Sequence, residues 1–153
     1  MQSQLDKTAV NQSGLYDEDF FEWTRRSAEL LRAGRFDHAD IGHIAEEIED
    51  MGKRDLRALG SHVEVLLAHL LKWQFQPEKR SASWQNTVAV QRAGVARLLA
   101  QYPSFRSRIE PDLAVNYEFA VRRAVRETGL PRSRFPSECP FTVEQILDPE
   151  FLP

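Results

Sequence analysis

Cysteine is nearly absent from this sequence, since Cys139 is the single one among 153 residues. One cysteine excludes an internal disulfide and a zinc site made only of thiolates. Long apolar runs are also absent, because the richest one, residues 63–71, is interrupted by Glu64 and His69. A membrane-spanning helix needs about 20 largely apolar residues. We therefore expect no membrane span.

Several functional signatures are missing as well. The chain has no glycine-rich phosphate loop, nucleophile elbow or dinucleotide fingerprint, so no motif determines a chemistry. Residues 1–13 are polar and lack the apolar core of a signal peptide. We therefore expect a cytoplasmic protein in which residues 1–15 form a flexible leader and residues 16–153 form one helical domain. The 42% hydrophobic and 28% charged content supports a folded chain.

Charge is distributed unevenly along the chain, although the net charge is only -3. Residues 1–60 carry 8 basic and 13 acidic groups, residues 61–137 carry 12 and 6, and residues 138–153 carry none and 4. This split favours either an anionic partner or the packing of an acidic helix beside a basic one. The second arrangement, within one fold or across a dimer, is the simpler interpretation.

Apolar residues recur at helical spacing in five segments, approximately 20–31, 41–51, 56–70, 84–102 and 113–124. Asp17 or Asp19 can cap the first segment, Asp37 or Asp40 can cap the second, and Gly52 predicts a break or kink between the second and the third. Ser81 or Ser83 can cap the fourth segment, and Gly129 ends the fifth. The positions expected to face inward in the first two segments are Phe20, Trp23, Ser27, Leu30, Leu31, Ile41, Ile44, Ala45, Ile48 and Met51.

The C-terminal tail, residues 132–153, is rich in proline and contains one short helix that Thr142 can cap. We expect it to fold back on the helices through apolar residues such as Phe135, Phe141 and Ile146. No segment shows the sustained alternation of a strand. The sequence therefore predicts an all-α, single-domain antiparallel bundle of about five helices with the extended tail packed on it.

Four segments carry a family resemblance, and they are residues 16–20 (YDEDF), 45–52 (AEEIEDMG), 69–81 (HLLKWQFQPEKRS) and 138–147 (ECPFTVEQIL). Through them the chain, from Tyr16 to Pro153, resembles a bacterial family known only as domain of unknown function number twenty-nine. The resemblance implies a helical fold. It implies no activity, because the family has no established catalytic residues.

The first candidate site is a metal site on the second predicted helix. His43, Glu47 and Asp50 share one helical stripe at the spacing i, i+4, i+7, so they can converge on a divalent cation, with His69 as a further ligand. The acidic helix resembles half of the metal signature of all-helical nucleotide pyrophosphohydrolases, but the second half is missing. The alternative is a solvated face with ion pairs such as that between Glu49 and Lys53.

The second candidate site is a surface for anions or nucleic acid, in which basic residues alternate with aromatic ones. Its members are Lys72, Lys79, Arg80, Arg92 and Trp84. The alternative is a helix–loop–helix corner that buries the aromatic rings. Gln91 lies in the middle of an apolar face, and we expect it to hydrogen-bond to His62, to His69 or to a backbone carbonyl.

These observations favour a small helical interaction or regulatory protein that has no catalysis of its own and acts through a protein partner or a homo-oligomer. One alternative is a metal-dependent enzyme that acts on a phosphate-containing substrate. The other is non-specific nucleic-acid binding by the basic middle of the chain.

Overall fold

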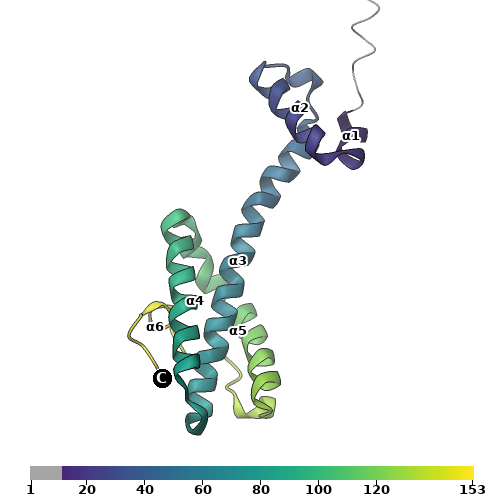
Figure 1. The fold of residues 1–153 in the computed structure, drawn as a ribbon. Helices are drawn as coiled ribbons and strands as arrows, with labels where there is room; N and C mark the ends of the chain where they lie inside the picture. The colour runs from purple at the N-terminus through teal and green to yellow at the C-terminus, as the bar shows by residue number, and fades with distance from the viewer. Residues whose placement is uncertain (1–11) are drawn as a thin grey trace, which may run out of the picture. The chain divides into compact units, whose positions relative to one another are not determined.

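The computed structural model describes residues 12–153, and these residues form helices and connecting loops without a strand (Figure 1). The all-α fold class is therefore confirmed. None of the helices in this range is long and apolar enough to cross a bilayer. The helices are α1 (Gln12–Glu18), α2 (Phe20–Arg32), η2 (Phe36–His38), α3 (Ile41–Phe75), η3 (Pro77–Lys79), α4 (Ala82–Gln101), η4 (Pro103–Phe105), α5 (Arg106–Thr128), η5 (Arg132–Arg134) and α6 (Val143–Leu147).

The chain divides into two compact units, which we call the first unit and the second unit. The first unit ends at Lys53, and its described part is residues 12–53; the second unit is residues 54–153. The boundary falls inside α3, whereas domain boundaries usually lie in flexible linkers. The single helical domain from residue 16 to residue 153 therefore stays a prediction. The expected leader lies mostly outside the described residues, and residues 12–15 belong to α1.

The break predicted at Gly52 is wrong, because α3 continues as one α-helix from Ile41 to Phe75, whereas the predicted alternative, a kink, stays a prediction. A glycine inside a helix costs only about 1 kcal/mol relative to alanine, and the hydrogen bonds of the turns on both sides outweigh that cost. No neighbouring atom lies within 4 Å of the position that a Cβ of Gly52 would take. The glycine is therefore tolerated on an exposed stretch of the helix rather than required by a turn.

The second unit contains the hydrophobic core. In it α4 and α5 lie alongside the C-terminal half of α3, and the tail packs on the bundle (Figure 1). The apolar stripe of α3 supplies the centre of this core, because Leu66, Leu67 and Leu70 are fully buried. The predicted contribution of the tail is confirmed, since Phe135, Phe141 and Ile146 are buried in the same cluster.

Caps at the helix ends follow the predicted positions. The side chain of Asp19 accepts a hydrogen bond from the Glu22 amide at the start of α2, and Ser81 does the same for Trp84 at the start of α4. Thr142 and Gln145 form a complete capping box at α6. Gly129 ends α5 in the left-handed conformation, with a φ of 72°, which glycine adopts without strain.

A polar contact inside the second unit confirms the expected partner of Gln91. His62 Nδ1 lies 2.7 Å from Gln91 Oε1, so the amide on α4 is satisfied by an imidazole on α3. Gly94 makes this contact possible, because a Cβ there would stand 2.6 Å from the His62 ring. The absence of a side chain at one position of α4 therefore allows α3 and α4 to approach around the ring.

Arg92 holds the tail against α4. Its guanidinium is buried and donates to three backbone carbonyls: Nε to Ile146 at 2.9 Å, Nη2 to Gln145 at 3.2 Å and Nη1 to Pro149 at 3.4 Å. The last carbonyls of α6 have no partner within their own helix, and a cation is favoured at that end. Burial lowers the pKa of Arg92, but an arginine remains charged in proteins.

The first unit has almost no core. Among its described residues only Trp23 and Ser27 are buried, and both lie on α2. The inward orientation predicted for several apolar residues is wrong, since Ile48 is 64% exposed and Met51 is 61% exposed. The reason is that a helical stripe becomes buried only where another element packs on it. The other predicted core residues that are exposed are Phe20, Leu31, Ile41 and Ala45.

We expect Arg92→Met to lower the free energy of unfolding of the second unit by about 2–4 kcal/mol, because the substitution leaves three tail carbonyls without their donor. Arg97→Met is the matched control, since Arg97 is exposed on the same helix. Urea unfolding at 25 °C measures both variants. Equal stability of the two variants would show that the guanidinium does not anchor the tail.

Candidate functional site

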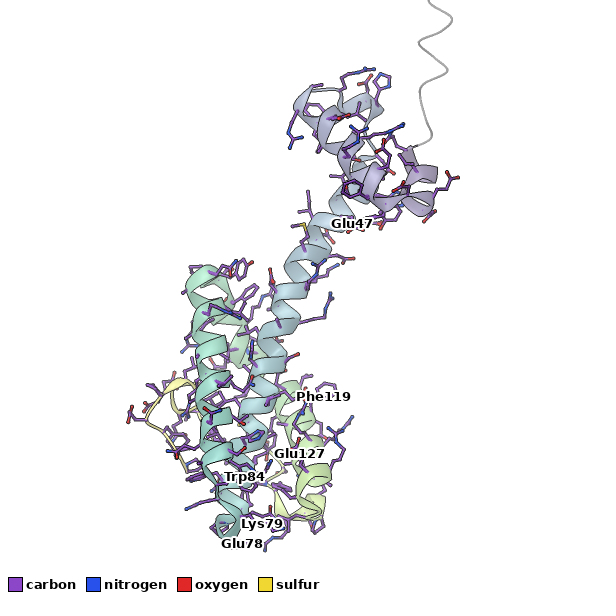
Figure 2. The ribbon with its side chains drawn as sticks, viewed as in Figure 1. Glu47, Glu78, Lys79, Trp84, Phe119 and Glu127 are labelled. Atoms are coloured by element: carbon purple, nitrogen blue, oxygen red, sulfur yellow. The ribbon has the colours of Figure 1, made fainter. Side chains whose placement is uncertain are left out.

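A polar and aromatic cluster joins α1 to α3 in the first unit. The Tyr16 hydroxyl donates to Glu47 Oε1 at 2.5 Å, and the Tyr16 ring stacks on His43 with centroids 4.0 Å apart. The hydrogen bond to Glu47 raises the pKa of Tyr16 to about 12. Glu47, which Figure 2 labels on α3, is thus an acceptor for a phenol from α1.

Asp40 lies at the centre of the second half of this cluster. Its Oδ2 lies 2.6 Å from His43 Nδ1 and accepts from Ser13 Oγ at 3.2 Å. Burial alone would raise the pKa of Asp40, but the hydrogen bonds from His43 and Ser13 outweigh burial and lower it. The same bond to Asp40 raises the pKa of His43. Asp40 and His43 therefore form an ion pair at pH values between the pKa of Asp40 and the pKa of His43.

Serine, histidine and aspartate are the residue types of a hydrolase triad, but their order here differs. In a triad the histidine bonds to the serine hydroxyl and the aspartate orients the histidine. Here Ser13 and His43 both bond to Asp40. The hydroxyl therefore has a carboxylate as its acceptor rather than an imidazole base, and the arrangement attaches α1 to the start of α3 without activating a nucleophile.

The four predicted metal ligands are not gathered in one place. His43 and Glu47 belong to the cluster with Tyr16, whereas Asp50 is exposed and lies 3.5 Å from Lys53. His69 belongs to the second unit, where its Nδ1 donates to the Val65 carbonyl at 2.9 Å and burial lowers its pKa. Residues 12–153 contain no group of three or more histidine, cysteine or acidic side chains suited to a metal ion. Metal binding stays a prediction without support from this geometry.

Lys72 is a buried cation in the second unit. Its Nζ donates to Glu127 Oε2 at 2.8 Å and lies 4.6 Å from the centroid of the Trp84 ring. Figure 2 labels these two partners of Lys72, Glu127 and Trp84. Arg123 extends this network, since it pairs with Glu127 at 3.6 Å and with Glu64 at 3.0 Å. Lys72 on α3 thus contacts two other helices: it forms an ion pair with Glu127 on α5 and a cation–π contact with Trp84 on α4.

The predicted anion-binding residues are used in different ways. Lys72 and Trp84 contact each other inside the bundle, and Arg92 binds the tail carbonyls. Arg80 is exposed, but its Nε donates to the Trp73 carbonyl at 2.8 Å and its guanidinium lies 5.0 Å from the Trp73 ring centroid. Lys79 is exposed on η3. Nucleic-acid or anion binding by this set stays a prediction.

A groove between α3 and α5 was not expected from the sequence. It lies in the second unit and has a volume of about 460 Å³. Val115 and Phe119, which are 59% and 48% exposed, line it on the α5 side. The signal in the sequence is that these two apolar residues stand at i, i+4 outside the core stripe of α5. The other lining residues are Leu56, Arg57, Leu59, Gly60, Ser61, Val63, Glu64, Arg108, Ile109, Asp112 and Asn116.

The exposed apolar residues of the first unit are the second feature that was not expected from the sequence. Seven of the large apolar side chains in its described part are exposed, and most were expected in the core. The same residues 12–53 carry 11 acidic and 5 basic groups, a net charge of -6. We call this set the acidic apolar surface, and its apolar members are Phe20, Phe21, Leu31, Phe36, Ile41, Ile48 and Met51.

Comparison with known proteins gives one match. The family model described as "Domain of unknown function DUF29" matches residues 15–152, which is nearly the whole chain. No curated protein and no solved structure matches the chain. The family match agrees with the resemblance of the four sequence segments.

We expect Asp40→Asn to lower the pKa of His43 in the folded protein, because the substitution removes the carboxylate that stabilises the imidazolium. The pKa of His43 is raised on folding and that of Asp40 is lowered. The Asp40–His43 pair therefore stabilises the attachment of α1 fully between about pH 4 and about pH 6.5, and less as the pH rises through the folded pKa of His43 or falls through that of Asp40. NMR titration of the His43 ring measures the shift. Asp37→Asn is the control, because that carboxylate lies beside His38 instead. An unchanged titration of His43 in Asp40→Asn would contradict the assignment.

We expect Glu127→Gln to destabilise the second unit by about 1–3 kcal/mol, because the substitution leaves the buried Lys72 ammonium without its carboxylate. The loss is smaller than for a fully buried pair, since about a third of the Glu127 side chain is exposed. Adding Lys72→Met should restore part of the loss by removing the unpaired charge. Urea unfolding of the single and double variants measures the coupling, and strictly additive effects would refute it.

Proposed function

Because the chain belongs to the DUF29 family, which is described only as a domain of unknown function, we propose a function from its geometry. The chain is a protein-interaction module, and its contact element is the first unit. In this proposal the acidic apolar surface is the binding surface, and the second unit is the stable body that presents it. The module works by association and has no catalysis of its own.

The observation that supports this proposal is the imbalance of burial in the first unit. Fixing the backbone costs about 1–2 kcal/mol for each residue, and apolar burial must offset most of that cost. Units of this length rarely have enough core to do so alone. The described part of the first unit buries one large apolar side chain, Trp23, and exposes seven. Contact with another polypeptide surface would supply the missing burial.

The chemistry of the exposed residues also fits a protein partner. Exposed apolar patches rimmed by polar groups are typical of interaction sites, and phenylalanine and methionine are enriched at such sites. The net charge of -6 favours a partner surface with basic groups, because complementary charge accelerates association and selects the partner. The polar cluster around Asp40 keeps α1 attached to α3 and so shapes the acidic apolar surface.

The setting that we propose is the bacterial cytoplasm, where a lone thiol such as Cys139 stays reduced. The enzyme and nucleic-acid alternatives have less support. Lys72 and Arg92, which would neutralise phosphate, make their contacts inside the second unit. Glu47, the central predicted ligand, accepts a hydrogen bond from Tyr16.

We expect a photo-crosslinking residue at position 51, in cells that produce the protein, to give a discrete adduct with another polypeptide. The same residue at position 100, an exposed alanine on α4, should give none. Mass spectrometry identifies the partner, which can be another copy or a different protein. Absence of an adduct at position 51 would contradict the proposed function.

A pair of glutamate substitutions provides the matched control. Ile48→Glu places a charge on the acidic apolar surface and should abolish the adduct from position 51. Val90→Glu places the same charge on α4, at a residue that is exposed to a similar degree, and should leave the adduct in place. An equal loss in both variants would indicate a general effect of charge or folding.

A further inference from the structure

We infer that the partner of the acidic apolar surface is a second copy of the chain, and that the first unit of each copy binds the α3/α5 groove in the second unit of the other. The inference rests on the proposed function and specifies its partner. It makes the assembly a two-fold homodimer with two equivalent interfaces, which is the commonest closed symmetry of soluble proteins.

The groove has the apolar lining that such a contact needs. Its inner wall contains Leu59, Val63 and Ile109, which belong to the buried core, and its α5 side carries the exposed Val115 and Phe119. Figure 2 labels Phe119 on α5. A groove of about 460 Å³ has room for large side chains of the kind that the first unit exposes.

The charges at the groove complement those of the first unit. Arg57 and Arg108 line the groove, are exposed and form no ion pair with another residue of the described range. Two acidic residues also line the groove: Glu64 is already paired with Arg123 at 3.0 Å, whereas Asp112 is exposed and forms no ion pair with another described residue. The second unit carries 14 basic and 11 acidic groups, a net charge of +3, against -6 for residues 12–53. The groove is therefore an apolar channel in the more basic unit, and its lining has two unpaired cations against one unpaired carboxylate among the described residues.

The first unit has exposed apolar side chains beside acidic groups, whereas the groove has apolar side chains beside basic groups. Ile48 and Met51 are exposed on α3, and Glu46, Glu49 and Asp50 are exposed beside them. Among the described residues, Lys53 is the basic group that pairs with these carboxylates, at 3.4 Å from Glu49 and 3.5 Å from Asp50. Apolar side chains surrounded by excess negative charge fit an apolar groove flanked by unpaired arginines.

Charge also argues against the other symmetric contact, in which two first units pack on each other. That contact would bring together two surfaces that each carry -6, and like charges in an interface are strongly unfavourable. Contact between the first unit of one copy and the second unit of another brings together opposite net charges. The reciprocal exchange satisfies both copies at once.

Two charge-reversed proteins test the pairing. The groove variant carries Arg57→Glu and Arg108→Glu, and the surface variant carries Glu46→Lys and Glu49→Lys. We expect the wild type to be a dimer by sedimentation equilibrium, and each variant alone to dimerise at least about tenfold more weakly, because like charges then face each other. An equimolar mixture should recover a heterodimer, since both of its interfaces again join opposite charges.

The control keeps the net charge of the groove variant but moves the substitutions. Arg97→Glu with Arg126→Glu reverses two exposed arginines of the second unit that do not line the groove, and this protein should dimerise like the wild type. A monomeric wild type, a groove variant that dimerises normally, or a mixture that stays monomeric would each overturn the inference.

The result separates this inference from the function on which it rests. An adduct from position 51 with a different protein would overturn the homodimer and leave the interaction module intact. No adduct at all would overturn both. In the homodimer the adduct has twice the mass of the chain, and its second attachment point lies among the residues that line the groove, for which Phe119 is the clearest marker.

Discussion

The buried leucine face of α3 is the constraint on which the rest of the second unit depends. Leu66, Leu67, Leu70 and Leu71 lie on one helix and are fully buried. Burying each of them contributes about 1.5–3 kcal/mol, provided that other elements cover it. α4, α5 and the tail supply that cover from three directions, and the polar contacts among them occur where this apolar packing has already brought the helices together.

Buried charged side chains add specific contacts to the apolar packing of the second unit. Lys72 and Arg92 are buried cations, and each donates hydrogen bonds to residues far away in the sequence. Lys72 bonds to Glu127, and Arg92 bonds to the carbonyls of the tail. Isolated buried charges are strongly unfavourable, so each restricts which neighbour can lie beside it. The described part of the first unit, residues 12–53, has neither a buried leucine face nor a buried cation. Its polar contacts around Asp40 and Glu47 attach α1 to α3, but they bury little apolar surface.

Much of the fold could be predicted from the sequence, because helix boundaries depend on local signals. Asp19, Ser81, Thr142 and Gly129 mark helix ends through short-range backbone contacts, and the structure places all four at those ends.

Other expectations from the sequence failed. Gly52 suggested a break in the helix that is absent, because a glycine in a helix carries a small free-energy cost that the hydrogen bonds of the surrounding turns outweigh. The prediction that Ile48 and Met51 lie in the core failed for another reason. Periodicity shows that a helix has an apolar face, but it does not show which surface covers that face. The contact between Tyr16 and Glu47, and the groove beside Phe119, join residues far apart in the chain, so local patterns could not reveal them.

Arg92 has a consequence for the order in which the molecule forms. The three carbonyls that bind its guanidinium are synthesised 53 to 57 residues after it. During translation the side chain therefore stays hydrated while α4 is already outside the ribosome, and the last layer of the bundle closes only after the tail has emerged. A polypeptide that ended before Gln145 would leave Arg92 in water and the apolar surface that the tail covers exposed, and such a product would be a good substrate for the proteases that clear incomplete chains.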